Sequence, residues 1–127
     1  MAACAMIVAG LGFRRAAGPD SLRDALARAL GDRAVNALAT AEDKAEAAAL
    51  AALARALGLP LVGVPPEALA VQPTLTRSEA SFAARGTGSL AEAAALAAAG
   101  PGARLIAPRC LSQDRMASCA LAEGETT

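Results

Sequence analysis

The sequence predicts an α/β fold: a three-layer α/β/α sandwich around a mostly parallel, mixed sheet. Three observations support this prediction. Short apolar runs alternate with longer stretches in which apolar residues recur at helical spacing. Glycine and proline separate most of these segments. Hydrophobic residues make up 55% of the 127 residues and charged residues 19%, which excludes a disordered chain and fits a single domain over 1–127.

The first half of the chain contains three expected strands and two expected helices. In order they are a strand over 5–9, a helix over 21–30, a strand over 34–39, a helix over 40–57 and a strand over 59–64. The first strand is an unbroken apolar run that ends at Gly10, which is typical of a strand buried on both faces. Ser21 and Asp24 form a start signal for the first helix, and Gly31 and Gly58 end the two helices.

The second half contains a short helical turn, one long helix and two strands. They are expected over 65–69, 89–99, 104–107 and 117–122, with a long polar loop over 71–81 and a frayed tail over 123–127. Ser89 and Glu92 have the spacing of a capping box. Because only residues 108–116 separate the last two strands, we expect them to pair antiparallel and make the sheet mixed.

Charge and aromatic content exclude two classes of partner. Twelve basic residues balance twelve acidic ones, so the chain has no overall cationic footprint for nucleic acid. Phe13 and Phe82 are the only aromatic residues, too few for a base-stacking surface. The apolar stretch over 2–11 is shorter than the roughly 20 residues that span a bilayer. In a secretory signal the basic residues precede the apolar stretch, whereas here Arg14 and Arg15 follow it. We therefore expect a cytoplasmic protein that binds no membrane.

Metal and cofactor chemistry have little support. The chain has no histidine, and its three cysteines, Cys4, Cys110 and Cys119, form no C-x-x-C pair, so we expect no metal site and three thiols in a reducing compartment. Without histidine, no Ser/His/Asp or Cys/His catalytic arrangement can form. The segment from Gly10 has Arg15 where a dinucleotide fingerprint needs its third glycine. We therefore expect no cofactor.

The candidate site lies where parallel strands end, because ligands of such sheets bind beyond the carboxyl ends of the strands. Four segments are expected there: 10–15, 40–44, 85–89 and, if its strand runs parallel, 108–109. Gly10 and Gly12 would let the backbone turn and approach a ligand. Arg14 and Arg15 offer forked donors for a carboxylate or phosphate. The alternative is a solvated turn with two surface arginines.

A second candidate group follows the second strand. Lys44 is the only lysine among twelve basic residues. It follows Asp43 in the first turn of the helix expected to open at Thr40, beside free backbone N–H groups. Lys44 is a candidate for an anion contact or a proton donor, and Asp43 is the other catalytic candidate. The alternative is a solvated lysine paired with a nearby carboxylate.

The third candidate group leads into the helix over 89–99. It consists of Arg85, Gly86, Thr87, Gly88 and Ser89. The start of a helix exposes backbone N–H groups to an anion, although the spacing is not that of a P-loop. The plain alternative is a turn with Ser89 as the helix cap. We call Arg14, Arg15, Lys44, Arg85 and this helix start the cationic rim.

Four motifs in order resemble the CobE/CbiG C-terminal domain family of cobalamin biosynthesis. They lie at 10–15 (G-L-G-F-R-R), 38–44 (L-A-T-A-E-D-K), 57–61 (L-G-L-P-L) and 87–96 (T-G-S-L-A-E-A-A-A-L). The resemblance covers nearly the whole chain. Phe13 stands where the family tends to have a small polar residue or cysteine, and Arg109 where a lysine is usual.

The resemblance implies a role in building the corrin ring, with a precorrin-type tetrapyrrole intermediate as ligand and other cobalamin-pathway enzymes as candidate partners. Three functions stay open. The chain could bind a precorrin through the cationic rim. It could hydrolyse a lactone-bearing precorrin-5A-type intermediate, with Lys44 or Asp43 assisting proton transfer. It could be a small phosphate- or nucleotide-binding domain that uses residues 86–89. The alanine-rich helix faces could form a homodimer or face solvent.

Overall fold

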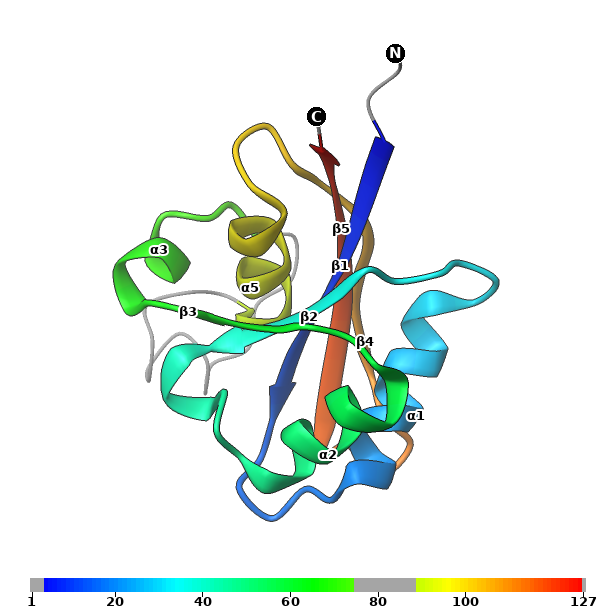
Figure 1. Ribbon diagram of the computed structural model, residues 1–127. Helices are drawn as coiled ribbons and strands as arrows, with labels where there is room; N and C mark the ends of the chain where they lie inside the picture. Colours follow the sequence, from blue (N-terminus) through cyan, green and yellow to red (C-terminus); the bar gives the residue numbers. More distant parts are fainter. Residues whose placement is uncertain (1–3, 75–88, 127) are drawn as a thin grey trace.

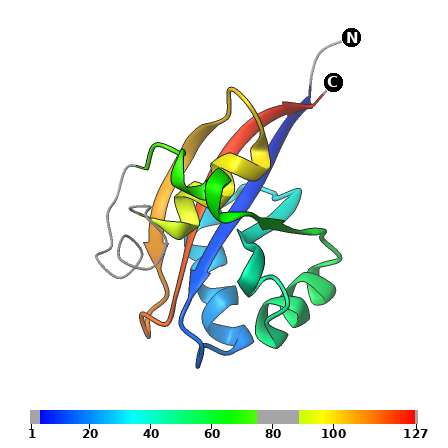
Figure 2. The ribbon, with the colours of Figure 1, turned by 90° about the vertical axis from the view of Figure 1, so that its left-hand side faces the viewer.

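The computed structural model describes residues 4–74 and 89–126, which form a five-stranded sheet with helices on both faces (Figures 1 and 2). In chain order the elements are β1 (Cys4–Phe13), α1 (Pro19–Leu30), β2 (Ala37–Ala41), η1 (Glu42–Lys44), α2 (Ala48–Leu57), β3 (Leu61–Val64), α3 (Pro66–Ala70), α5 (Leu90–Ala99), β4 (Arg104–Leu111) and β5 (Ala117–Thr126). The predicted α/β fold with a mixed sheet is confirmed. The loop expected over 71–81 falls outside the described residues from residue 75 onward.

The strand order is β3-β2-β1-β5-β4. β2 pairs parallel with both β1 and β3, whereas β5 pairs antiparallel with both β1 and β4. Strands β1 to β4 therefore run in one direction and β5 in the other. The carboxyl ends of β1 to β4 therefore lie at the same edge of the sheet, where the hairpin also joins β4 to β5. We call this edge the carboxyl edge.

Leucines dominate the core on one face of the sheet, whereas alanines are the commonest core residues on the other. On one face, α1 and α2 bury leucines against those of the central strands, namely Leu22, Leu26, Leu50 and Leu53 against Leu11, Leu38 and Leu121. On the other face, α3 and α5 bury Leu69, Leu90 and Leu96 against Val8 and Val64. Within the described residues, no helix combines the length and apolarity needed to cross a bilayer.

Glycines let α5 lie directly on the sheet. A Cβ at Gly10 would overlap the carbonyl oxygen of Ala91 and the backbone nitrogen of Ala95. A Cβ at Gly124, on the neighbouring strand β5, would overlap the carbonyl oxygen of Ala99. The turn expected at Gly10 and Gly12 is wrong, because both glycines lie inside β1. The close approach of α5 explains why a side chain is excluded at Gly10.

The helix expected over 40–57 is also wrong at its start. Thr40 is buried in β2, and the chain then makes the short turn η1 before α2 begins at Ala48. The Thr40 hydroxyl donates a hydrogen bond to the Leu11 carbonyl at 2.7 Å, which holds this residue in the sheet. Lys44 therefore ends a 3₁₀ turn and does not lie in the first turn of an α-helix.

Other expected boundaries also differ from the structure. The strand expected over 34–39 is β2, which begins at Ala37 and ends at Ala41, and the strand expected from residue 59 is β3, which begins at Leu61. β4 continues through Pro108, which an edge strand tolerates. β5 extends to Thr126 by pairing with β1, so the tail is not frayed over 123–126. The start of α1 is formed by Gly18 and Pro19, while Ser21 and Asp24 bond to the β4–β5 hairpin.

Substituting Gly10→Ala should lower the free energy of unfolding by about 1–3 kcal/mol, the usual cost of overpacking a dense interior. Urea unfolding monitored by circular dichroism measures this change. Gly18→Ala is the matched control, because nothing lies within 4 Å of a Cβ there and its φ of −95° suits any residue. Equal midpoints for the two variants would contradict the packing described above.

Candidate functional site

Near the carboxyl edge, side-chain hydrogen bonds connect β1 and β2 in place of backbone pairing. The paired residues of these strands end at Gly10 and Ala39. Beyond them, Thr40 donates to the Leu11 carbonyl, and the Lys44 ammonium donates to the Phe13 carbonyl at 2.8 Å. The Lys44 nitrogen also lies 4.6 Å from the centroid of the Phe13 ring. Thr40 and Lys44 thus hold the end of β1 in place.

These contacts give Lys44 a structural role beside any functional one. The side chain is half-buried and places its charge next to the β1–α1 loop, which carries Arg14 and Arg15. A carbonyl oxygen and the face of an aromatic ring both attract an ammonium group. Asp43, the other catalytic candidate, is exposed on η1. The three cations Arg14, Arg15 and Lys44 therefore gather at one end of the sheet.

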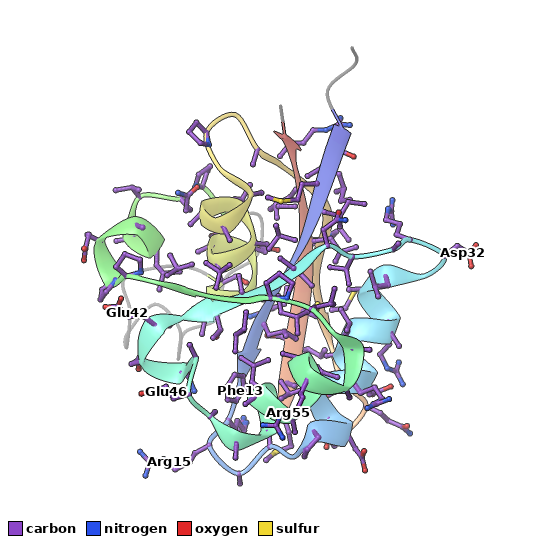
Figure 3. The ribbon with its side chains drawn as sticks, in the orientation of Figure 1. Phe13, Arg15, Asp32, Glu42, Glu46 and Arg55 are labelled. Carbon is purple, nitrogen blue, oxygen red and sulfur yellow. The ribbon has the colours of Figure 1, made fainter. Side chains whose placement is uncertain are left out.

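A hollow of about 380 Å³ lies between the β1–α1 loop and the start of α2. Its lining residues come from these two segments and the end of β1: Phe13, Arg15, Ala17, Gly18, Pro19, Ala47, Ala48 and Ala49. We call it the β1–α2 pocket. Arg15 is exposed and extends from the loop (Figure 3). The pocket therefore joins one exposed guanidinium to a mainly apolar wall.

The start of α2 adds backbone donors to this wall. Its N-cap, Ala47, has no side-chain oxygen and makes no capping hydrogen bond. The first N–H groups of an α-helix have no partner inside the helix. The sequence predicts such donors beside Lys44, but the structure places them at Ala48 and Ala49, in the wall of the pocket.

The remaining predicted site residues are not part of this pocket. Ser89 is fully buried on the opposite face of the sheet, where its hydroxyl accepts the Glu92 N–H at 3.2 Å and caps α5 as predicted. Gly10 and Gly12 are buried beneath α5. The described residues do not include the predicted site residues Arg85, Gly86, Thr87 and Gly88.

Arg109 lies near the end of β4, which runs in the same direction as β1. Its N–H donates to the Glu92 carboxylate at 2.9 Å.

The described part of the cationic rim is mixed in charge. Glu42, Asp43 and Glu46 are exposed on or beside η1, next to Lys44 in the chain. Figure 3 shows Glu42, Glu46 and Arg15 on the same side of the molecule. Positive charge is therefore concentrated on the β1–α1 loop, and a polyanionic ligand would meet carboxylates on the η1 side.

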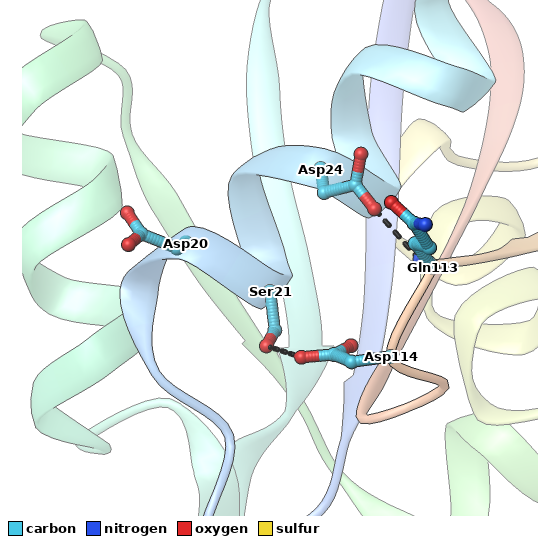
Figure 4. Close-up of a pocket in the computed structure, with 5 residues that line it drawn as sticks. All are labelled: Asp20, Ser21, Asp24, Gln113 and Asp114. Atoms are coloured by element: carbon cyan, nitrogen blue, oxygen red, sulfur yellow. Dashed lines mark hydrogen bonds between the residues drawn. The ribbon is translucent and has the colours of Figure 1, made fainter.

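A cluster of acidic residues that the sequence did not reveal lies between α1 and the β4–β5 hairpin (Figure 4). Asp20, Ser21, Asp24, Gln113 and Asp114 line a hollow of about 430 Å³ between α1 and the β4–β5 hairpin. Asp114 accepts hydrogen bonds from the hydroxyls of Ser21 and Ser112, and Asp24 accepts the Gln113 N–H at 2.7 Å. These hydrogen bonds hold the β4–β5 hairpin on α1. We call the group Ser21, Asp24, Ser112, Gln113 and Asp114 the Asp114 latch.

The latch keeps both carboxyl groups ionised. Hydrogen bonds from the Ser112 and Ser21 hydroxyls lower the pKa of Asp114 to about 2. The pKa of Asp24 is also lowered, and the main cause is the hydrogen bond that its carboxylate accepts from the Gln113 N–H. Neither group is suited to donate a proton at neutral pH. The Ser-x-Asp spacing over 112–114 is a local turn signal, but nothing in the sequence identifies α1 as its partner.

Comparison with known proteins agrees with this fold. The family model for the C-terminus of cobalamin synthesis protein G matches residues 7–122. The chain belongs to this family. The resemblance inferred from four short motifs is thus confirmed, and the chain is a protein of the cobalamin biosynthesis pathway. No curated protein sequence matches the chain.

Three solved structures resemble the chain over almost its full length. CobE, from the cobalamin (vitamin B12) biosynthetic pathway, is 35% identical with a TM-score of 0.84, over 97% of this chain and 94% of CobE. Cobalamin biosynthesis protein chiG from Agrobacterium tumefaciens str. C58 is 37% identical with a TM-score of 0.67, over 92% and 97%. A cobalamin biosynthesis protein G homologue from Sulfolobus solfataricus, at 18% identity and a TM-score of 0.69, shares the fold over 93% of this chain and 36% of its own.

The Asp114 latch predicts a specific dependence of stability on pH. The pKa of Asp114 in the folded protein, about 2, lies below its ordinary value of 3.8. Its stabilising contribution is therefore present above the ordinary value and is lost as pH falls through about 2. The difference in melting temperature between the wild type and Asp114→Asn should shrink over this interval. Thermal unfolding from neutral to acidic pH measures it.

Asp32→Asn is the control for this series, because Asp32 is exposed after the end of α1 and lies away from the hairpin. Its melting temperature should follow that of the wild type at every pH. A difference between wild type and Asp114→Asn that stayed constant into acid would contradict the latch.

Proposed function

We propose that this chain binds a precorrin-type tetrapyrrole intermediate of cobalamin biosynthesis at the β1–α2 pocket. Membership of the cobalamin synthesis G C-terminal family supports the pathway. The observation that carries the proposal is the pocket itself, where Arg15, the uncapped start of α2 and the Phe13 ring line one hollow. Precorrins carry acetate and propionate side chains around an apolar macrocycle, so they need both kinds of surface.

Each part of the pocket suits a different part of such a ligand. The Arg15 guanidinium can bind a carboxylate with two parallel hydrogen bonds. The first N–H groups of α2 stabilise a negative charge that lies close to them. Phe13, Pro19 and the alanines of α2 offer an apolar wall. A volume of about 380 Å³ lies at the lower end of the range for small-molecule sites, so we propose that the pocket takes one carboxylate arm and an adjoining edge of the macrocycle.

The energetics require several contacts at once. Micromolar binding needs about 8 kcal/mol. A hydrogen bond to a charged group contributes about 1.5–3 kcal/mol. One carboxylate on Arg15 is therefore insufficient, and further contacts to Arg14 and to the start of α2 are needed. A ligand with many carboxylates on a rigid ring can supply them together.

We propose binding without turnover as the role of the isolated chain. Lys44 is engaged with the Phe13 carbonyl and ring, which supports a role in fixing the β1–α1 loop more than one in proton transfer. Asp24 and Asp114 are held ionised within the latch. Other enzymes of the pathway would then act on the bound intermediate or receive it.

Arg15→Ala should weaken binding of a corrin carboxylic acid by about tenfold, the equivalent of about 1.4 kcal/mol lost with one charged contact. A titration followed by the absorbance of the corrin gives the dissociation constant. Arg33→Ala is the matched control, because Arg33 is exposed in the turn between α1 and β2, at the opposite end of β2. Its affinity should equal that of the wild type.

Two results would overturn the proposal. Unchanged affinity in Arg15→Ala would remove the pocket from the binding site. Release of a two-carbon fragment from a lactone-bearing precorrin by the purified chain alone would show a hydrolase in place of a binding protein. An Asp43→Asn variant would then test whether that carboxylate takes part in the reaction.

A further inference from the structure

Two cysteines face each other across the β4–β5 pair. Cys110 of β4 and Cys119 of β5 are direct partners in the antiparallel register. Both belong to the side of the sheet covered by α1 and α2, where Cys119 lies in the core cluster and Cys110 packs against it. Their thiols therefore point to the same face, and both are free in this structure.

The register places this pair within reach of a disulfide bond. Directly opposed residues of antiparallel strands have Cα atoms about 4.5–5.5 Å apart. Disulfide bonds join cysteines whose Cα atoms are about 4.4–6.8 Å apart. The ladder is irregular between Ala107 and Cys110, but the register is regular again from Cys110 to Leu111. No movement of whole elements is needed to bring the two sulfur atoms together.

The two thiols have different surroundings. Cys110 is half-buried on an edge strand, so a small oxidant can reach it from solvent. Cys119 is fully buried, and burial raises the pKa of its thiol well above the usual range. Because the thiolate is the reactive form, Cys110 is the thiol expected to react first. Cys119 is then the neighbour that completes the bond.

We propose that Cys110 and Cys119 form a reversible cross-strand disulfide when the protein meets a peroxide. The Cys110 thiolate attacks one peroxide oxygen, the O–O bond breaks, and a sulfenic acid and hydroxide form, the latter taking up a proton to become water. The Cys119 sulfur then attacks the Cys110 sulfur. The S–O bond breaks, the thiol proton of Cys119 leaves with the hydroxyl group as water, and one disulfide remains.

The bridge would lie beside the latch at the carboxyl edge. Cys110 precedes Ser112 by two residues, and Ser112 donates to Asp114 in the hairpin held on α1. Joining the strands at this point would restrict the hairpin further. A dithiol reductant would reverse the bond, since the half-exposed strand edge leaves the Cys110 sulfur open to attack.

Limited hydrogen peroxide followed by mass spectrometry tests the proposal. The folded protein should lose two hydrogens in mass, its free thiols should fall from three to one, and digestion should yield a peptide pair joined through Cys110 and Cys119. Dithiothreitol should restore all three thiols. Cys110→Ser and Cys119→Ala, each shown to be folded by circular dichroism, should give no such loss.

Cys4→Ser is the matched control and should still form the bridge. Cys4 pairs with Thr126, seven residues along β5 from Cys119, which is roughly 23 Å at the rise of a strand. Oxidation of Cys110 to the sulfinic acid without a bridge, or bridging only in denaturant, would overturn the proposal. A bridge that instead joined Cys4 or two separate chains would do so as well.

Discussion

The close contact between α5 and the backbone of β1 and β5 is the constraint on which the rest of the structure depends. Gly10 and Gly124 leave room for the helix backbone, and the alanines Ala91, Ala95 and Ala99 bring small surfaces to it. Such contacts give little apolar area per side chain, so their strength depends on dense packing. The helix thus packs directly on the two central strands, whose pairing with their neighbours forms the carboxyl edge.

A buried side chain connects the same helix to the edge strand β4. Glu92 is fully buried in the first turn of α5, beside its cap, Ser89. Its carboxylate accepts the Arg109 N–H, where the β4–β5 ladder is irregular and Pro108 interrupts it. A buried carboxylate is costly unless hydrogen-bonded, and a buried N–H likewise. This hydrogen bond gives each of the two groups a partner and lets β4 continue toward the hairpin.

Local signals predicted much of the fold, and contacts between distant residues account for what they missed. Apolar runs and turn residues indicated the order of elements and the antiparallel final pair, because these depend on neighbours in the chain. The helix start at Thr40 was wrong because its partner, the Leu11 carbonyl, is 29 residues away. The sequence did place Lys44 and both arginines at one edge of the sheet. It did not reveal the hydrogen bond between Ser21 and Asp114, because these residues are 93 positions apart.

Native-state hydrogen exchange tests the central role of α5 most directly. We predict that the amides of α5, β1 and β5 share the highest protection and exchange only through global unfolding, because the helix backbone packs directly on these two strands. The amides of α1 should open at lower free energy, because only four of its twelve residues are buried, against eight of ten in α5. Exchange of α5 by local opening, while β1 and β5 stay protected, would contradict this role of the helix.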